Sequence, residues 1–568
     1  MTNLQIAELL RNVASAYQYK DQNKYKFQTI AYNRAADSIE HANSELKDLW
    51  DDGKLNDIPS IGKSIATHLD EIFRTGKSKH FEELMKDIPK DAFTLMILPK
   101  VGLKTAMKMI SELSKDELSE KVKEAEKLKN KIKRHLLPYA ENIAAEVVKW
   151  LKEGGGVEKI DTLGSLRRKS ATVGDIDILV SPKITNDKLQ ITNKDIINRF
   201  INYPNIQKVI EAGEITASIL LPSNVQVDML VMSSKSNGNA LQHFTGSKFH
   251  NIALREHSLK KGWSMNEHGI KNVKSGETIG IKTEKELYEF LDLKYIEPEL
   301  REDMGEIEAS KNNNLPNLVK LEDIKADLQI HSNFDIETSH DLGINSMEEI
   351  IENARKLNYE YIAFTEHNPS KKGHSEKQIE ELLKRKRDKV EQLNYSYKKR
   401  VPFVFNSLEI DMGKDGSLPV SEKGLDLLDF ALVSIHSSFD LTRDDMTKRV
   451  INALSHPKAK IFAHPTGRKI NEREGVELNW EKIFEFVLKE DKWIEINSDP
   501  MRLDLPDMLV REAVKYGVKL TMGTDTHSID MMDNMKYGIN VARRGWADKK
   551  DIVNTLNLKE FKEMLQSK

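Results

Sequence analysis

The sequence contains no cysteine, no long apolar run and no clear excess of charge of either sign. Without cysteine there are no disulfides and no thiolate metal ligands, so any bound metal must rely on His, Asp and Glu. No apolar stretch approaches the length of a membrane span, and the amphipathic segment 1–17 lacks the pattern of a signal peptide. These absences predict a cytoplasmic protein with no membrane association.

The charges are balanced over a long chain. The 568 residues, enough for about three to five domains, include 87 Lys and Arg against 90 Asp and Glu, for a net charge of −3. This balance does not favour nucleic-acid binding over the whole surface. Any contact with DNA must therefore come from local basic faces and from the N-termini of helices.

The most informative segment joins a small-residue turn to paired carboxylates. Residues 164–168 read Gly-Ser-Leu-Arg-Arg and precede the strand-like run 173–180, which carries Asp175 and Asp177. Side chains two apart on a strand point to one face, so the two carboxylates can share a metal site. Asp228, within the alternating segment 225–230, is a third candidate. Three carboxylates beside a Gly-Ser turn and arginines suit two-metal nucleotidyl transfer.

A plainer interpretation is that Asp175 and Asp177 are solvated carboxylates at a strand end. Two like charges about 4 Å apart repel by about 4 kcal/mol at a near-surface dielectric. Such a pair favours a bound cation, although an arginine can also serve. The arginines before the strand and the later Asp228 favour the catalytic interpretation.

Residues 164–180 resemble the active-site signature of the family X DNA polymerases, the DNA polymerase beta group. The resemblance continues through 243–247 and 261–267. It implies that Asp175, Asp177 and Asp228 are catalytic and bind Mg²⁺ or Mn²⁺. It also implies that the incoming nucleotide is bound by Arg134, Gly164, Ser165, Arg168, Gly174, Phe244, Thr245, Gly246 and Asn251. Arg255 would contact the template strand, and His243 replaces the usual Tyr, which leaves sugar selectivity open.

The first third of the chain is expected to be helical and carries one pattern twice. Residues 58–66 and 98–106 each place an apolar-Gly turn before a helix start, about forty residues apart. The bare amides of such a start can bind a phosphate oxygen without reading base sequence. One copy alone is often an ordinary turn, but two favour paired helix-hairpin-helix clamps. Their predicted DNA-binding residues are Gly62, Lys63, Gly102, Lys104 and, further along, the Lys-rich helix 115–133 as a weaker candidate.

This third resembles the lyase and fingers regions of the same polymerases. Some relatives use a Schiff-base Lys in the first clamp helix to excise deoxyribose phosphate. The matching position here is His68. Since an imidazole does not form that imine as an amine does, we expect weak or absent lyase activity.

Beyond a polar boundary at 306–322, the chain repeats a strand followed by a polar side chain. Segments 361–367, 430–436 and 460–464 end in His, segment 404–408 leads to Glu409, and segment 519–527 ends in an Asp-x-His pair. Strands alternating with helices imply parallel pairing, so side chains at successive carboxyl ends converge on one face of a barrel. A single strand-end His is often a satisfied core residue, but this many in register favour a metal cluster. Clustered metals suit phosphoester hydrolysis.

The region resembles the polymerase-and-histidinol-phosphatase domain, a distorted barrel of seven strands. The resemblance implies two or three Mn²⁺, Zn²⁺ or Fe ions, bound by His331, Asp341, His367, Glu409, His436, His464, Asp525 and His527. Gln329 stands where the family usually has a His, so occupancy by a third metal is open. Asp335 is the alternative to Asp341, because the loop 333–342 is lengthened. Glu366 is expected to support His367.

These observations predict a multidomain α+β and α/β protein. The expected parts are a DNA-binding helical domain (1–80), fingers (81–143), a nucleotidyltransferase palm with a mixed sheet (144–235), a thumb (236–305), a linker (306–322) and the metal-dependent phosphoesterase domain (323–568). The expected activity is short-gap DNA synthesis in repair on gapped or primer-template DNA with deoxynucleoside triphosphates. The C-terminal barrel would act as a 3′-5′ exonuclease, with 3′-phosphate trimming or abasic cleavage as alternatives. A monomer is expected.

Two other functions fit parts of the sequence. One is a small-molecule phosphoesterase of the histidinol phosphate type with a vestigial polymerase. The intact triad and Arg168 argue against decay of the polymerase. The other is a non-catalytic protein that binds DNA ends. The two clamp motifs support binding, but a purely binding role leaves the many convergent ligands without a use.

Overall fold

The computed structural model describes the chain apart from residues 1–2, 23, 41–45, 47–49, 51–54, 56–60, 99–100, 130–133, 186–187, 190–191, 205, 222–224, 398–401, 472 and 567–568. The chain divides into two compact units, residues 1–133 and 134–568. Parts of both predicted clamp turns, residues 58–60 and 99–100, lie outside the described residues.

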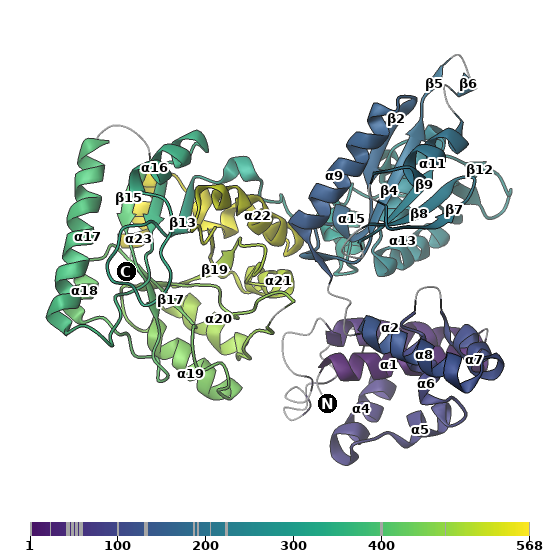
Figure 1. The fold of residues 1–568 in the computed structure, drawn as a ribbon, viewed down its shortest axis with the longest axis horizontal. Coiled ribbons are helices and arrows are strands. Elements are labelled where there is room, and N and C mark those ends of the chain that lie inside the picture. The colour runs from purple at the N-terminus through teal and green to yellow at the C-terminus, as the bar shows by residue number, and fades with distance from the viewer. Residues whose placement is uncertain are drawn as a thin grey trace. The chain divides into compact units, whose positions relative to one another are not determined.

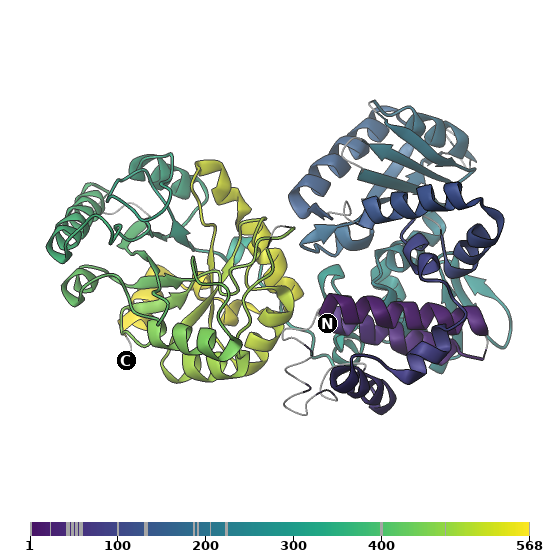
Figure 2. The ribbon, with the colours of Figure 1, turned by 60° about the horizontal axis from the view of Figure 1, so that its bottom comes forward.

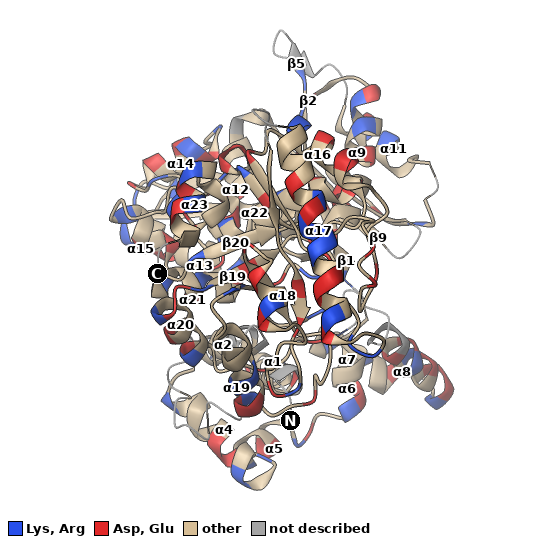
Figure 3. Ribbon diagram, turned by 90° about the vertical axis from the view of Figure 1, so that its left-hand side faces the viewer, with Lys and Arg blue, Asp and Glu red and all other residues tan. Residues whose placement is uncertain are grey.

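The described part of the first unit is helical, as the apolar periodicity predicts. One core joins α1, α2, α4 and α5, and a second joins the short α6 and α7 to α8. The seven helices are α1 (Asn3–Lys20), α2 (Lys26–Glu40), α4 (Lys63–Thr75), α5 (Lys79–Met85), α6 (Lys90–Leu95), α7 (Leu103–Glu112) and α8 (Lys115–Lys129). Helix α8 carries both signs of charge along its length (Figure 3), as expected of a solvated face.

The second unit begins with a five-stranded mixed sheet of order β2-β4-β9-β8-β7. Only the β4–β9 pair is parallel. The elements here are β1 (His135–Leu136), α9 (Leu137–Glu153), β2 (Val157–Thr162), α10 (Gly164–Arg167), β3 (Thr172–Val173), β4 (Ile176–Pro182), β5 (Ile184–Thr185), β6 (Lys188–Leu189), α11 (Asn193–Ile201), β7 (Lys208–Ala212), β8 (Thr216–Leu221) and β9 (Val225–Val231).

Helices α9 and α11 cover one face of this sheet (Figure 2). Ile176, Ile178 and Val180 of β4 are buried against them, because alternate strand residues share a face. On the other face, Leu179 packs against Ala240 and α12. Asp177 lies on that second face, two residues before Leu179 along β4.

A smaller helical and hairpin region follows, with its own core. Its elements are α12 (Asn237–Thr245), α13 (Lys248–Lys260), β10 (Trp263–Asn266), β11 (Gly269–Asn272), β12 (Thr278–Ile279), α14 (Glu284–Phe290) and α15 (Glu306–Lys311). The expected polar linker 306–322 is packed rather than free. Glu306 is fully buried and lies 2.6 Å from His250 Nδ1, and Leu318 belongs to the core of this region.

The remaining residues form parallel strands alternating with helices (Figure 1). The strands make two sheets, β13-β14-β15 and β16-β17-β18-β19-β20, and isolated parallel bridges join Ile330 to Thr526 and His367 to Glu409. The strands are β13 (Ala326–Ile330), β14 (Tyr361–Phe364), β15 (Phe403–Asn406), β16 (Glu409–Asp411), β17 (Ala431–Ser434), β18 (Ala459–Phe462), β19 (Trp493–Asn497) and β20 (Leu520–Gly523). The two sheets do not form one closed sheet, so the predicted distorted barrel of seven strands is not confirmed.

Helices alternate with these strands, as the sequence pattern predicts. They are α16 (Met347–Lys356), α17 (Glu376–Ser396), α18 (Glu422–Asp426), α19 (Arg443–Leu454), α20 (Trp480–Lys489), α21 (Asp507–Tyr516), α22 (Met535–Arg544) and α23 (Leu558–Gln566). Among the described residues, no helix combines the length and the apolar character needed to cross a membrane.

Candidate functional sites

Asp175, Asp177 and Asp228 converge on one edge of the five-stranded sheet. The β4–β9 register places Asp177 directly opposite Asp228, and Asp175 immediately precedes β4. One carboxylate oxygen from each lies within 4.8 Å of the others. Gly164 lies beside them: a Cβ atom there would be 2.6 Å from Asp177 Oδ2. Only glycine allows this close approach, and its φ of 56° is also easiest for glycine.

The electrostatics of this carboxylate cluster favour a bound cation. Burial, then Asp175 and Asp228, raise the pKa of Asp177 to about 7, against a lowering by Arg168. Burial and Asp228 also raise the pKa of Asp175, while Arg134 opposes the shift. Three close carboxylates, of which Asp175 and Asp177 have raised pKa values, are a donor set that a divalent cation fits.

Gln226 is a further polar residue at this cluster. Its Nε2 donates to both carboxylate oxygens of Asp228, at 3.0 and 2.9 Å. The sequence interpretation did not include Gln226. The alternation of β9 was a usable signal, because residues 226 and 228 must share a face.

The predicted phosphate-binding residues lie around the same carboxylates. Helix α10 begins at Gly164 and includes Ser165, and Arg168 follows it. Arg168 donates through Nη1 to the carbonyl of Thr245 at 2.6 Å, and its Nε lies 2.9 Å from Glu302 Oε1. Arg134, which is exposed, donates through Nε to Thr172 Oγ1 at 2.9 Å.

Gly174 allows Arg134 to lie against the strand. A Cβ atom at Gly174 would be 3.0 Å from Arg134 Nη1, so a larger residue would displace the guanidinium. The position thus places one positive charge beside Asp175, whose pKa Arg134 lowers against the effect of burial.

The predicted sugar, base and template residues lie in and after α12. Thr245 is buried, Gly246 has a φ of 70°, and Phe244 packs at the edge of the small core containing Leu179. Asn251 Nδ2 donates to the carbonyl of His243 at 2.6 Å. Arg255 Nη2 donates to His243 Nδ1 at 2.9 Å, which keeps that nitrogen an acceptor.

The two predicted phosphate clamps are helix starts with bare amides. Gly62 precedes α4 and Gly102 precedes α7, and neither helix has a side-chain cap. Among the described residues, a Cβ atom at either glycine would meet nothing within 4 Å. Lys63 and Lys104 are exposed in the first turns. This geometry can bind a phosphate oxygen at each helix start.

The second cluster centres on the fully buried Glu409 at the start of β16. Glu409 Oε1 lies 2.8 Å from His464 Nε2 and 3.3 Å from His436 Nε2. Glu409 Oε2 lies 3.3 Å from His331 Nε2, which is equally close to Asp525 Oδ1. His367 and His527 complete a group with His331 whose ligand atoms lie within 4.8 Å of one another.

Several imidazole nitrogens in this cluster are buried without a hydrogen-bond partner. They are His331 Nδ1, His367 Nδ1, His464 Nδ1 and His527 Nε2. A buried polar atom without a partner destabilises the fold. A cation bound between the two carboxylates would satisfy several of these nitrogens at once. The pKa of His331, which burial lowers, is raised to about 10 by Asp525 and Glu409. His and carboxylate donors in this arrangement fit divalent transition metals.

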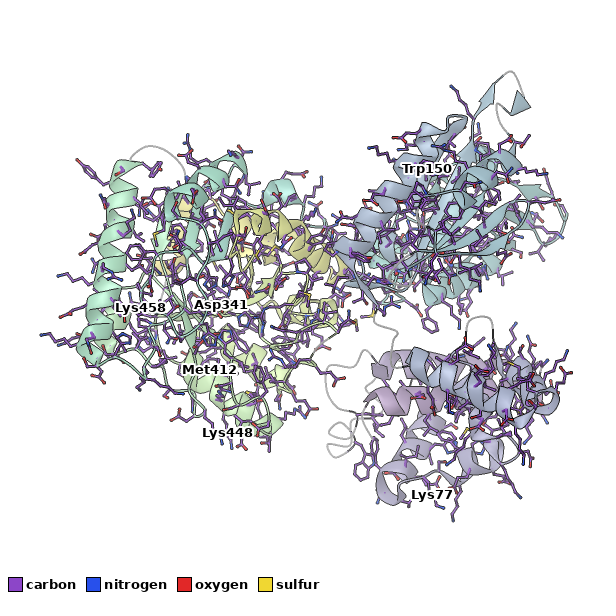
Figure 4. The ribbon with its side chains drawn as sticks, viewed as in Figure 1. Lys77, Trp150, Asp341, Met412, Lys448 and Lys458 are labelled. Atoms are coloured by element: carbon purple, nitrogen blue, oxygen red, sulfur yellow. The ribbon has the colours of Figure 1, made fainter. Side chains whose placement is uncertain are left out.

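Asp341, the ligand expected in the loop, lies near His527, His367 and His340, which lower its pKa against the effect of burial. His340, rather than Asp341, forms a possible ligand group with His367, Asp411 and His436. Asp341, labelled in Figure 4, is exposed and belongs to none of the described ligand groups. The alternative, Asp335, is also exposed, and its Oδ1 accepts from the amide of Glu337. His340 was missed because it lies in the loop 333–342 and not at a strand end.

Asp411 is a second residue that the sequence interpretation missed. Its Oδ1 lies 2.6 Å from His436 Nδ1, and its Oδ2 lies 3.1 Å from His340 Nδ1. Asp411 therefore orients both rings and leaves the Nε2 atom of each for a ligand. Its position two residues after Glu409 on β16 was the available signal.

Two predicted departures from the family pattern are visible. Gln329 is buried, and its Nε2 donates to Glu409 Oε2 at 2.8 Å. Glu366 was expected to support His367, but its oxygens pair with Ser332 and Lys386 instead. That expectation was wrong because Lys386, from α17, is buried beside Glu366 and needs a counter-charge.

Comparisons with known proteins cover both regions. Residues 1–78 match a helix-hairpin-helix domain model, and residues 240–302 match the DNA polymerase beta thumb. The chain is 30% identical over 587 residues to the DNA polymerase/3′-5′ exonuclease PolX of Bacillus subtilis (strain 168), covering 99% of each.

Two further relatives match parts of the chain. A probable phosphatase of Thermoanaerobacter sp. (strain X514) is 25% identical over 39% of this chain and 88% of its own length. DNA polymerase lambda of Rattus norvegicus is 22% identical over 53% of this chain and 56% of its own. The full-length match, the thumb and the helix-hairpin-helix domain together show that this chain belongs to the family X DNA polymerases.

Proposed function

We propose that this protein fills short gaps in DNA and also hydrolyses DNA from the 3′ end, at two separate metal-dependent sites. The observation that carries the proposal is that one chain holds two distinct ligand clusters, one of carboxylates and one rich in His. The B. subtilis relative is named for both activities. Short-gap synthesis in repair is the use we assign to the polymerase site.

At the polymerase site, Asp175, Asp177 and Asp228 would hold two Mg²⁺ or Mn²⁺ ions. Such ions supply activation of the primer 3′ oxygen and neutralisation of the leaving pyrophosphate. The backbone of Gly164 with the hydroxyl of Ser165 would orient the triphosphate. Arg168 and Arg134, whose guanidinium groups lie beside the carboxylates, would pair with its phosphates.

The residues after α12 would select the nucleotide. Phe244, Thr245 and Gly246 would contact the sugar, and Asn251 the base. Arg255 would reach the template side while holding the ring of His243 through its hydrogen bond. Sugar selectivity is therefore assigned to the backbone around Gly246 rather than to the His243 side chain.

At the hydrolytic site, two or three Mn²⁺, Zn²⁺ or Fe ions would be held by His331, His340, His367, Glu409, His436, His464, Asp525 and His527. Such ions supply an activated water for attack on a phosphoester. Asp411 would keep His436 and His340 in the tautomer that leaves Nε2 free. Arg502, whose Nε lies 3.4 Å from Asp525 Oδ2, would pair with the scissile phosphate.

We assign the parts of the chain as follows. Residues 1–80 and 81–143 would grip gapped or primer-template DNA through the helix starts at Gly62 and Gly102. Residues 144–235 would serve as the palm and 236–305 as the thumb, to which the packed segment 306–322 adds. The two parallel sheets within 323–568 would act together as a distorted barrel.

One gel tests the proposal. A 5′-labelled primer on a short-gap duplex is incubated with the protein and Mn²⁺, with and without the four deoxynucleoside triphosphates. We expect extension with nucleotides and shortening without them. Asp228→Ala should abolish extension alone, and His436→Ala should abolish shortening alone. Loss of both activities in either variant would contradict two independent sites.

A second candidate function is hydrolysis of small phosphate monoesters. The similarity of 39% of this chain to a probable phosphatase favours it. In that case the protein would release phosphate from free monoesters and leave the labelled primer unchanged in both reactions.

A further inference from the structure

The C-terminal region contacts the backbone of both arginines assigned to the triphosphate. Asn471 Nδ2 donates to the carbonyl of Arg134 at 2.8 Å. Arg544 Nη1 donates to the carbonyl of Arg168, also at 2.8 Å. We infer that Asn471 and Arg544, from the hydrolytic half of the chain, position the phosphate-binding arginines of the polymerase site. This inference rests on the proposed roles of Arg134 and Arg168.

Arg544 is built into a fixed geometry at the end of α22. Its side chain is 11% exposed, and its Nε lies 2.6 Å from Asp507 Oδ2 at the start of α21. The carboxylates of Asp507 and Glu302 and the carbonyl of Arg168 all accept hydrogen bonds from the planar guanidinium of Arg544. These three contacts restrict rotation of the guanidinium. The carbonyl of Arg168 is held against a rigid support rather than a mobile surface side chain.

Arg544 also acts on the charge of Arg168 through Glu302. Glu302 Oε1 lies 2.9 Å from Arg168 Nε and 2.9 Å from Arg544 Nη1, so one oxygen serves two cations. With Arg544 present, the carboxylate is shared and Arg168 keeps net positive charge for a phosphate. Without Arg544, Glu302 would pair with Arg168 alone and compete with the triphosphate.

A second contact supports the same loop. Tyr537, from α22, hydrogen bonds with Glu141 of α9, whose Oε1 accepts from Lys169 Nζ at 2.6 Å. Lys169 directly follows Arg168 and has a φ of 55°, a conformation that is uncommon for non-glycine residues. Helix α22 therefore contacts Arg168 directly through Arg544 and supports Lys169 indirectly through Glu141.

The same helix supplies a matched control. Arg543 also crosses to the polymerase half, where its Nε lies 2.8 Å from Glu299 Oε1 and its Nη1 donates to the carbonyl of Val319. It makes no described contact with Arg134, Arg168 or Glu302. Arg543→Ala removes a partly buried ion pair from the same interface and leaves the contacts of Arg168 and Lys169 unchanged.

The test is steady-state single-nucleotide gap filling by the full-length chain. Arg544→Ala and Asn471→Ala should each raise KM for the deoxynucleoside triphosphate, Arg544→Ala by roughly tenfold, as expected for one hydrogen bond to a charged group. The kcat value should change less than KM. Arg543→Ala should leave KM within about twofold of the unmodified chain. Adding Glu302→Gln to Arg544→Ala should recover part of the loss, because the competing charge is gone.

The outcomes separate this inference from the proposed function. If Arg168→Ala raises KM but Arg544→Ala matches Arg543→Ala, the positioning role is overturned and the polymerase assignment stands. If Arg168→Ala itself has no effect on KM, the assigned triphosphate contact fails first. Shortening of a labelled primer by the Arg544→Ala protein, at the rate of the unmodified chain, checks that the fold is intact. If Arg544→Ala raises KM and lowers kcat and the rate of shortening by the same factor, Arg544 has a structural role only.

Discussion

Asp177 and Asp228 face each other directly across the parallel strands β4 and β9. Because the two residues are paired in a parallel register, both side chains leave the sheet on the same face. Burial, followed by repulsion from Asp175 and then from Asp228, raises the pKa of Asp177 to about 7. The fold therefore maintains a destabilising pair at the place where chemistry needs a cation, as expected where function and stability conflict.

Asp228→Asn should separate these two consequences. Extension of a primer should fall by more than about a hundredfold, since even residues that only support a metal ligand are worth 10- to 100-fold. In metal-free buffer the same variant should melt at a higher temperature, because one of three close negative charges is gone. Calorimetry with a chelator measures the second effect. A lower melting temperature would mean that Gln226, which donates to Asp228, outweighs the repulsion.

Asp411→Asn tests whether a carboxylate that contacts two candidate ligand histidines controls the hydrolytic site. The amide cannot accept equally from His436 and His340, so both rings should lose their orientation. Primer shortening should fall by about 10- to 100-fold while extension stays unchanged. Asp415→Asn, four residues later and exposed, is the matched control. Equal shortening by the Asp411→Asn and unmodified proteins would leave Asp411 as an ordinary ion-pair partner.

Gln329→His should add a ligand to the hydrolytic site. Gln329 is buried, and its amide already contacts Glu409, so an imidazole there would face the same cluster. We expect more bound metal per chain after dialysis, measured by elemental mass spectrometry. Gln378→His, on the exposed start of α17, is the control for surface binding. Unchanged metal content in the Gln329→His protein would show that Asn497, which also contacts Gln329, holds the side chain away.

The sequence predicted the residues at strand ends that the structure brings together in both clusters, but it did not single out His340 in the loop. Asp177 and Asp228, or Glu409 and His464, follow from strand periodicity, because the carboxyl ends of parallel strands meet at one edge. His340 lies in a lengthened loop, where no periodicity sets the direction of a side chain. The pairing of Glu366 with Lys386 was equally invisible, since Lys386 comes from the middle of α17 and reads as a solvated charge. The packing of segment 306–322 was not predictable either, because Glu306 contacts His250, which lies 56 residues earlier in the chain.

Glu284 should make the thumb sensitive to acid. Arg301, followed by Arg167, lowers the pKa of this buried carboxyl from 4.5 to about 2, against the effect of burial. A carboxyl with a depressed folded pKa stabilises the fold above its unfolded value and loses that effect as pH falls toward the folded one. Its contribution, roughly 3 kcal/mol, should be present at pH 6 and largely lost near pH 2.

Glu284→Gln measures that contribution. At pH 6 the variant should reach its unfolding midpoint at a lower denaturant concentration than the unmodified chain. The difference between the two midpoints should be smaller at pH 3. Because Arg301 would stay buried without a full counter-charge, the free energy of unfolding at pH 6 should fall by as much as about 3–5 kcal/mol. Glu286→Gln, in the same helix but exposed, is the control. A gap that does not depend on pH would mean that shape rather than charge sets the effect.

His68 should leave the protein without efficient excision of deoxyribose phosphate. Its ring lies half-buried, 4.7 Å from the ring of His80, and burial followed by His80 lowers its pKa. A neutral imidazole cannot form the imine that borohydride traps. We expect no covalent adduct on a 5′-deoxyribose phosphate end, seen as the absence of a shifted band on a denaturing gel.

His68→Lys should create the shifted band, because an amine at this half-buried position beside His80 would lose part of its positive charge and act as a nucleophile. Efficient trapping by the unmodified chain would mean that another amine serves, and Lys79→Ala would be the next variant to examine.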